Sequence, residues 1–324
     1  MASELIHAQG PYFDELEVGQ VFDAAPPCTL TSGRAAAHQA IVGDRLWLAL
    51  DAELSTRVTG GPLAHPALVW DVAIGQSTLV THHVKANLFY RNLVLQRQPH
   101  IGDALHTTTE VVALRENARR EGRKPTGLAA LRITTVDQAG RAVLDFYRCA
   151  MLPLCDEAET GHRHDLDAVG TVDQPDLLGS VADWDLSEAV KRVPRASVSP
   201  GDRIEVVGGD VISSGPELAR LTLNIATVHH DGAASGGERL VYGGHTIGIA
   251  MSQLTRAFPG LLTILGWHGC DHLAPVREGD VLRSTILVQQ VAPGPDDTRV
   301  VDLAIEVTNH EDAKVLDWRL VALL

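Results

Sequence analysis

Hydrophobic positions along the chain fall into two kinds of segment, separated by polar turns. Segments rich in Val, Leu, Ile and Thr and bounded by Gly, Pro or Asp predict strands. Two longer apolar segments, Pro66 to Gln76 and His245 to Phe258, predict buried helices. The main strands are predicted at residues 83–91, 103–114, 127–137, 142–152, 268–274, 280–292, 298–308 and 313–323. Short strands are predicted at 19–23 and 203–207, and short helices at 34–42 and 216–223.

The same elements occur twice in the same order, which indicates an internal duplication. Residues 143–152 (VLDFYRCAML) resemble residues 315–324 (VLDWRLVALL), 172 positions further along the chain. Residues 101–105 (IGDAL) resemble residues 278–282 (EGDVL), 177 positions further along. A longer hairpin loop in the first copy, at Arg115 to Lys124, accounts for the difference between the two offsets.

Each copy is expected to belong to the α+β class. Strands that follow one another directly pair antiparallel, and one apolar helix covers the buried face of each sheet. We expect an N-terminal domain at 1–154 and a C-terminal domain at 196–324. The stretch 155–195 carries Asp, Glu, Gly and Pro without sustained periodicity, which predicts a linker with Trp184 as an anchor.

Composition and charge narrow the class of protein. With 324 residues and 45% hydrophobic residues, the chain can bury a full core. Its net charge of −14 is expected to repel nucleic acid and anionic membrane. The four cysteines match no zinc or disulfide pattern. The N-terminus lacks the features of a signal peptide and no apolar run is long enough to span a membrane, so we expect a cytoplasmic protein.

Candidate chemistry gathers where the short helix at 216–223 should end. Asn224 and His229 are five positions apart, which separates them by about 140° on an unbroken helix. They can converge only if the helix ends and the chain bends between them. The plain alternatives are that Asn224 caps the helix C-terminus and that His229 and His230 are an exposed loop pair.

A second candidate lies at the start of the second long helix, where Gly243 and Gly244 allow close backbone approach to a ligand. A plain turn before a helix is the alternative. In the first copy Pro66 stands opposite Gly243, and proline has no N–H to donate. Ala49 stands opposite His229 in the degenerate segment that begins at Gly43. Only the second copy is therefore expected to carry chemistry.

Residues 267–272 (WHGCDH) suggest a metal site at first sight. Strand alternation would place His268, Cys270 and His272 on one face. The flanking hydrophobic residues and the lack of a fourth ligand favour a structural role, and the same alternation could direct one of the three toward a pocket. No metal is expected.

Residues 224–231 (NIATVHHD) resemble the motif Gly-Asp-x-Asn-Pro-x-His, often followed by x-Asp, of the MaoC-like (R)-specific enoyl-CoA hydratases and dehydratases. His229 and Asp231 match this motif, whereas Asn224 stands in place of the catalytic Asp. Residues 12–20 (YFDELEVGQ) are also typical of the family. The Asn-x-Ala-x-Val-His variant is similar to that of the mesaconyl-CoA hydratase (β-methylmalyl-CoA dehydratase) branch.

The resemblance implies a double hotdog fold, with two antiparallel sheets each wrapped on a long central helix. It implies a hydro-lyase that reversibly hydrates an enoyl-CoA thioester, of the (R)-3-hydroxyacyl-CoA or β-methylmalyl-CoA type, without a cofactor. The implied catalytic residues are Asn224, His229 and Asp231, and Gly243 and Gly244 would bind the thioester oxygen. His229 would be the base, and Asn224 would hold the water, since an amide cannot take a proton.

The remaining implications concern partners and rival activities. The first copy would supply the pocket for the acyl tail and CoA, although the sequence does not separate CoA from acyl carrier protein. Partners other than this substrate are not expected, apart from a homodimer, which stays a hypothesis. Two alternatives remain open, a hotdog acyl-CoA thioesterase and a catalytically inactive acyl-CoA-binding protein.

Overall fold

The computed structural model describes residues 7–156, 158–171, 176–195 and 197–324. Its N-terminal part contains short helix η1 (Phe13–Glu15), strands β1 (Val21–Phe22) and β2 (Cys28–Thr29), helices α1 (Ser32–Val42), α2 (Trp47–Leu50), α3 (Ala52–Thr59) and α4 (Pro66–Gln76), the turn η2 (Ser77–Leu79), and strands β3 (Ala86–Leu95), β4 (Ala104–Glu116), β5 (Thr126–Val136) and β6 (Ala142–Pro153). The C-terminal part repeats this order with β7 (Arg203–Glu205), β8 (Asp210–Val211), α6 (Gly215–Leu221), η4 (Thr227–His229), η5 (Gly232–Ser235), α7 (Gly243–Ala257), β9 (Thr263–His272), β10 (Val281–Pro293), η6 (Pro295–Asp297), β11 (Arg299–Thr308) and β12 (Lys314–Leu323).

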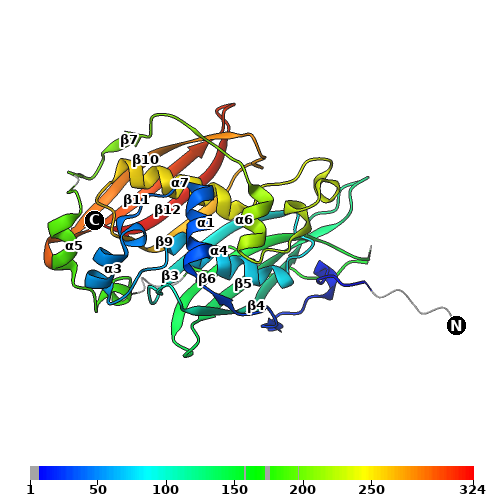
Figure 1. Ribbon diagram of the computed structural model, residues 1–324. Coiled ribbons are helices and arrows are strands. Elements are labelled where there is room, and N and C mark those ends of the chain that lie inside the picture. Colours follow the sequence, from blue (N-terminus) through cyan, green and yellow to red (C-terminus); the bar gives the residue numbers. More distant parts are fainter. Residues whose placement is uncertain (1–6, 157, 172–175, 196) are drawn as a thin grey trace.

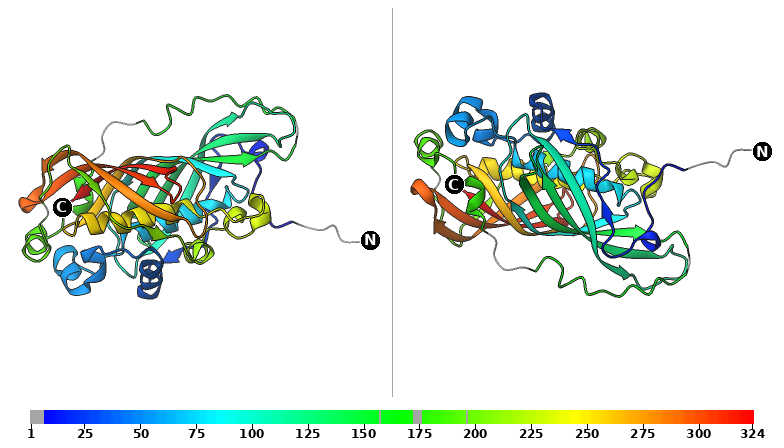
Figure 2. Two further views of the ribbon diagram at one scale, coloured as in Figure 1. Left: turned by 90° about the horizontal axis from the view of Figure 1, so that it is seen from above. Right: turned by 90° about the horizontal axis from the view of Figure 1, so that it is seen from below.

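The two copies share one antiparallel sheet rather than forming two separate ones. Its order is β1-β4-β5-β6-β3-β9-β12-β11-β10-β7, so the copies meet where β3 pairs with β9. Figure 2 shows three layers: the curved sheet, then α4 and α7, then the outer helices α1, α3 and α6. Within the middle layer α4 and α7 lie in contact, one from each copy (Figure 1). The expected α+β double hotdog is confirmed, with its sheets joined edge to edge.

Both long helices are where the sequence predicts them. α4 has the predicted bounds, and every one of its residues is buried between the sheet and the outer layer. α7 begins two positions earlier than predicted, at Gly243, and most of its residues are buried. α4 is apolar on nearly all sides, so its length rather than amphipathic periodicity identifies it, whereas α7 also carries polar residues such as Ser252 and Gln253.

Two main strands, β9 and β3, lie several residues from their predicted positions. The strand predicted at 268–274 is β9 and spans Thr263–His272. The segment from Thr263 to Trp267 is buried at every position, because β9 is central in the sheet and covered on both faces. Such a segment lacks the alternation that marks a half-buried strand. The strand predicted at 83–91 is β3, which is displaced in the other direction and spans Ala86–Leu95.

Equivalent hydrogen bonds confirm the duplication. Gln76 at the end of α4 donates from Nε2 to the Leu105 carbonyl at 2.9 Å. Gln253 in α7 donates to the Leu282 carbonyl at the same distance, and both residues lie 177 positions further along the chain. Each bond ties a central helix to the first strand of the following hairpin.

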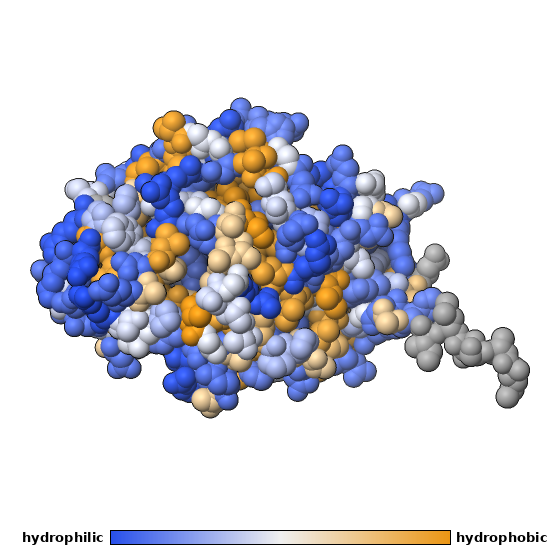
Figure 3. Space-filling view, in the orientation of Figure 1, coloured by the Kyte–Doolittle hydropathy of each residue, from blue (hydrophilic) through white to orange (hydrophobic). Residues whose placement is uncertain are grey.

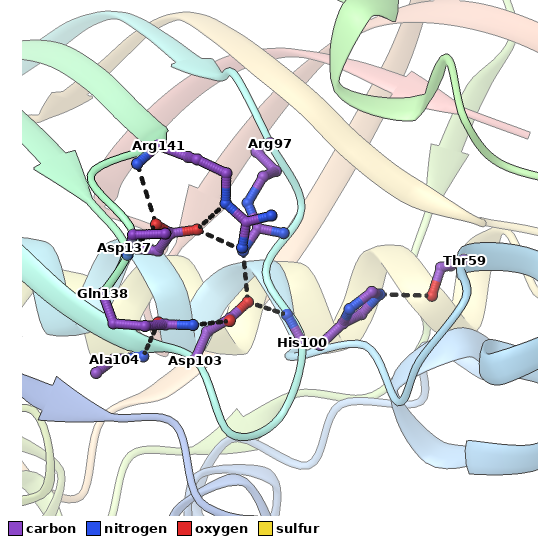
Figure 4. A network of polar contacts seen from close by, with 9 residues as sticks. Thr59, Arg97, His100, Asp103, Ala104, Asp137, Gln138 and Arg141 are labelled. Carbon is purple, nitrogen blue, oxygen red and sulfur yellow. Dashed lines mark hydrogen bonds and ion pairs between the residues drawn. The ribbon is translucent and has the colours of Figure 1, made fainter.

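The repeated Gly-Asp pairs have a structural role. The carboxylate of Asp103 accepts the backbone N–H of His100 at 2.9 Å, and that of Asp280 accepts the N–H of Arg277 at 2.8 Å. In the first copy Asp103 also pairs with Arg97 at 2.6 Å. Figure 4 shows that Arg97 bridges Asp103 and Asp137, which joins the turn before β4 to the β5–β6 hairpin.

The stretch predicted as a linker contains η3 (Leu178–Val181) and α5 (Leu186–Arg192). The Asp185 N–H donates to the Val58 carbonyl at the end of α3, and Trp184 packs against the small hydrophobic cluster that contains Val58.

On the face that carries the outer helices, exposed hydrophobic residues lie between polar ones (Figure 3). Within the described residues, no helix is both long enough and apolar enough to cross a membrane.

Candidate active site

The loop after α6 brings Asn224 and His229 together. α6 ends at Leu221, Leu223 takes a left-handed φ of 63°, and the turn η4 then carries His229. The loop rests on the end of α4, where a Cβ at Gly75 would lie 1.7 Å from the Thr222 carbonyl oxygen. Glycine is therefore required at position 75 for the second copy to lie against the first.

A cavity of about 590 Å³ opens between the two copies. Its walls come from the loop after α6, the start of α7, the end of β9, and β3, η2 and β6 of the first copy. Asn224, His229 and Gly243 all line it, whereas Asp231 and Gly244 do not. Its volume lies within the range of small-molecule binding sites.

The ring of His229 is held in one orientation and one tautomer. Its Nδ1 lies 2.9 Å from the Leu240 carbonyl oxygen, which can only accept, so Nδ1 carries the proton and Nε2 is left as an acceptor. The ring packs edge-to-face on Tyr242, with centroids 5.8 Å apart. Burial lowers the pKa of His229 to about 4, and the charge of Arg148 adds to this effect. His229 is therefore neutral near pH 7.

Asn224 is buried and lines both the cavity and a neighbouring pocket beside Leu223 and His230. Its Oδ1 accepts the N–H of Ala226 at 3.0 Å, and its backbone carbonyl accepts from Nε2 of His230 at 2.7 Å. These two bonds fix the residue and leave the amide NH₂ group to donate. His230, which the sequence analysis considered as part of an exposed His229–His230 loop pair, thus holds the backbone of Asn224 in place.

The start of α7 brings the backbone of Gly243 to the cavity. Gly243 occupies the first turn, where N–H groups have no partner within the helix. A Cβ at this position would lie 2.7 Å from Nε2 of His272, which explains the glycine. Gly244 faces the first copy instead, because a Cβ there would lie 2.2 Å from a carboxylate oxygen of Asp71. Of the two glycines, only Gly243 reaches the cavity.

Asp231 lies apart from the other candidates. Its carboxylate accepts the N–H of Ala233 at 2.9 Å and caps the short helix η5. It borders a separate, shallow hollow together with Arg239 and Glu278. The structure therefore does not bring Asp231 to Asn224 and His229.

The corresponding place in the first copy has different chemistry. Asp44 takes the same local turn as Asn224, because its carboxylate accepts the N–H of Leu46 at 2.7 Å. It also pairs with Nε2 of His65 at 2.8 Å, and both side chains are buried. Asp44 and His65 thus face each other as a buried pair, and Asp44 Oδ2 has no hydrogen-bond partner.

The alternation expected of His268, Cys270 and His272 is wrong. Gly269 and Trp267 pair with consecutive residues of β12, so His268 is the extra residue of a β-bulge. It is exposed and lies 3.4 Å from Asp302, whereas Cys270 is fully buried. His272 reaches the cavity wall, and burial lowers its pKa to about 4. The described residues contain no group of three or more metal-ligating side chains.

Two further cavity residues, Tyr90 and Arg148, come from the first copy and were not predicted. Arg148 is a cation inside an otherwise apolar strand, and Leu320 stands at the equivalent position of the second copy. That contrast between the copies is the signal that could have identified it. Lys85, Arg148 and Arg277 are the cations among the described cavity-lining residues, which include no Asp or Glu.

Comparisons with known proteins agree with this architecture. No family model matches the chain. It is 26% identical to the beta-methylmalyl-CoA dehydratase of Chloroflexus aurantiacus (97% of each chain) and 26% identical to the mesaconyl-CoA hydratase of Cereibacter sphaeroides (95% of this chain and 94% of the relative). A solved double-hotdog structure, a conserved hypothetical protein from Mycobacterium tuberculosis, is 51% identical, with a TM-score of 0.92 over 98% of this chain and 99% of the other. The structure of a MaoC domain dehydratase protein from Chloroflexus aurantiacus is 23% identical, with a TM-score of 0.85 over 97% of each chain.

Proposed function

Because this chain belongs to the MaoC-like family of double-hotdog proteins, we propose that it is a hydro-lyase that reversibly hydrates an enoyl-CoA thioester. One observation carries the proposal. The free Nε2 of His229 faces the same cavity as the amide of Asn224 and the first turn of α7. A base, a water-holding donor and an oxyanion site therefore meet in one place.

The proposed reaction uses His229 for both proton transfers. A water held by the Asn224 NH₂ group gives a proton to Nε2 of His229 while its oxygen bonds to the β-carbon of the enoyl group. The negative charge that develops on the thioester oxygen is stabilised by N–H groups at the start of α7, including that of Gly243. The protonated His229 then returns the proton to the α-carbon. Asn224 cannot act as the acid, since its amide NH₂ group donates hydrogen bonds but does not release a proton near neutral pH.

Asp231 and Gly244 have supporting roles in this proposal. Asp231 holds the η5 turn, and Gly244 lets α7 pack closely against Asp71 of α4. We further propose that the first copy binds the acyl group and CoA, since η2, β3 and β6 form one wall of the cavity. We also propose that the protein is cytoplasmic and forms a homodimer. The proposed reaction uses no metal or redox cofactor, and we propose no nucleic acid or membrane partner.

The charges around the cavity oppose the thioesterase alternative. A hotdog thioesterase that uses a carboxylate as base or nucleophile needs Asp or Glu beside the thioester carbonyl. The described lining residues contain neither. An inactive acyl-CoA-binding protein would share the cavity and its cations, so only an assay separates it from a hydratase.

The assay follows the enone absorbance of crotonyl-CoA and mesaconyl-CoA together with release of free thiol. Hydration removes the enone band without releasing thiol, thioester cleavage releases thiol, and a binding protein does neither. We expect His229→Ala to lower the hydration rate by about 100- to 10,000-fold, the range that general acid–base catalysis contributes. His268→Ala is the matched control, because His268 is an exposed histidine outside the cavity. An unchanged rate for His229→Ala would refute the site assignment.

A further inference from the structure

We propose that Arg148 is a specificity-determining residue that pairs with a carboxylate on the acyl part of the substrate. The enzyme would then prefer acyl-CoA thioesters that carry a second, free carboxylate over those with a plain hydrocarbon chain. This inference rests on the proposed function only in taking the cavity to be the acyl-binding site.

Arg148 is a buried cation without a carboxylate partner. Only 4% of it is exposed. Nη2 donates to the Thr81 hydroxyl at 2.6 Å and lies 3.3 Å from the Ser77 carbonyl oxygen. The Tyr90 side chain is a third hydrogen-bond partner of the guanidinium, and all three acceptors are uncharged. Nε is buried and has no hydrogen-bond partner. By contrast, Arg97 and Arg132 each pair with carboxylates in the described structure.

An unpaired buried guanidinium is costly, because the interior does not replace the water it has lost. Burial accordingly lowers the pKa of Arg148. The end of α4 offsets part of this cost, since the Ser77 carbonyl belongs to the turn that follows that helix. A bound carboxylate would supply the missing opposite charge and accept bonds from the guanidinium N–H groups that Thr81, Ser77 and Tyr90 leave unused.

The position of Arg148 indicates which part of the substrate it contacts. Arg148 pairs with Tyr90 across strands β6 and β3, and the ring of Tyr90 lies 5.8 Å from that of His272. His272 in turn adjoins Gly243, so Arg148 lies near the start of α7 on the wall of the same cavity. The phosphates of CoA lie at the far end of the long pantetheine arm, away from the reacting carbon atoms. Lys85 and Arg277, which are more exposed cavity residues, suit those phosphates better. The group that reaches Arg148 must therefore belong to the acyl chain.

The duplication argues against a purely structural need for the cation. Arg148 pairs with Leu131 of β5, and in the second copy Leu320 pairs with Leu303 of β11 in the same register. The fold thus accepts an apolar residue at this place. What distinguishes the two positions is the cavity, which Arg148 lines.

Binding of inert analogues tests the inference without requiring catalysis. Succinyl-CoA and butyryl-CoA differ only in a terminal carboxylate or methyl group, and neither has a double bond to hydrate. We expect the wild-type enzyme to bind succinyl-CoA at least about 10-fold more tightly by calorimetry. Arg148→Gln should abolish this preference, because removing one partner of a buried ion pair is costly. Arg148→Lys, which retains the charge, should keep part of it. Arg132→Gln is the control, since Arg132 pairs with Asp145 outside the cavity.

Turnover gives a second, independent readout. The two substrates compared are 2-methylcrotonyl-CoA and the mesaconyl-CoA isomer whose thioester lies beside the methyl-bearing carbon. They differ only at the far end of the acyl chain, where mesaconyl-CoA carries a carboxylate and 2-methylcrotonyl-CoA a methyl group. In Arg148→Gln, the kcat/KM for mesaconyl-CoA divided by that for 2-methylcrotonyl-CoA should fall by about 100-fold. A role limited to holding η2 against β6 would lower both values together, and thermal melting would show it.

The outcomes separate the inference from the proposed function. If the wild-type enzyme binds succinyl-CoA and butyryl-CoA equally, or if Arg148→Gln keeps the preference, the inference is wrong even when hydration is observed. If the preference depends on Arg148 but no enoyl-CoA is hydrated, the inference stands and the hydratase proposal falls.

Discussion

At the scale of single residues, the chemistry of His229 depends on where its two ring nitrogens point. The Leu240 carbonyl holds Nδ1–H, and the cavity receives Nε2. Asn224, which lines the same cavity, is held just as firmly by its bonds to Ala226 and His230, and these leave its NH₂ group to donate. Neither orientation depends on a bound ligand, and the site is therefore preorganised for a small polar molecule such as water.

The lowered pKa of His229 predicts an unusual pH dependence. An ordinary imidazole, with a pKa of 6.5, loses its basic form below that pH, whereas His229 stays neutral down to about pH 4. We therefore expect kcat/KM for hydration to stay level from pH 8 to about pH 5 and to fall only below that. Circular dichroism at each pH checks that the enzyme is folded. An inflection near pH 6.5 would contradict the buried, neutral state of this base.

At the scale of elements, the two β-hairpins show how one turn is built with different charges. Asp137 in the first copy and Asn309 in the second both accept backbone N–H groups two and four positions ahead. Only Asp137 also pairs with Arg97 and Arg141. The hairpin thus requires the side-chain oxygen, and the ion pairs of Figure 4 are an addition in the first copy.

This comparison predicts different effects for two substitutions at one position. Asp137→Asn keeps the turn, as in the second copy, and loses the ion pairs, so we expect a loss of about 1–2 kcal/mol in unfolding free energy. Asp137→Ala loses the turn bonds as well and should cost about 1–2 kcal/mol more. Denaturant unfolding measures both, and Asn309→Ala is the matched control for the turn alone. Equal losses for the two Asp137 variants would show that the turn bonds contribute nothing.

At the scale of the whole molecule, each copy depends on the other. The loop after α6 rests on the end of α4, where the Ile225 N–H donates to the Thr78 hydroxyl. Conversely, the end of α1 rests on α7, where the Ser252 hydroxyl donates to the Gly43 carbonyl. The candidate site takes its base from one copy and its buried cation from the other. Duplication allowed the two equivalent places to diverge, one into an open cavity and one into the Asp44–His65 pair.

Three histidines, two of them buried and His272 partly buried in the cavity wall, predict that the fold is sensitive to acid. Burial lowers the pKa of His229, His245 and His272 to about 4 each, against about 6.5 in an unfolded chain. Between these values the unfolded state binds more protons, so its stability relative to the folded state increases as the pH falls. We expect the melting temperature to drop steadily from pH 6.5 toward pH 4. Calorimetry at pH 7, 6 and 5 measures this trend.

His245 offers a variant that isolates the effect. It is fully buried in α7 with neither ring nitrogen partnered, and Leu68 occupies the equivalent place in α4. We expect His245→Leu to stabilise the protein, with the gain about 1–2 kcal/mol larger at pH 5 than at pH 7. The same gain at both pH values would mean that His245 is not the titrating group.

Local patterns of apolar residues and turns are enough to predict the duplication, the class of fold and most element bounds. The sequence by itself also singled out Asn224, His229 and Gly243, because a helix end, a short loop and a helix start are local features. Only the tertiary structure decided that β9 begins at Thr263, that His268 bulges out of its strand, and that Gly244 faces the first copy.

Arg148 and Asp231 show why local patterns do not reveal which side chains line the cavity. Whether a side chain reaches a cavity depends on which surfaces of distant elements meet, and no local pattern carries that information. Asp231 matches a motif two positions from His229, yet its loop turns it to a helix cap. Arg148 matches no motif, yet the joining of β3 to β9 and the contact of α4 with α7 place it in the cavity wall beside the second copy.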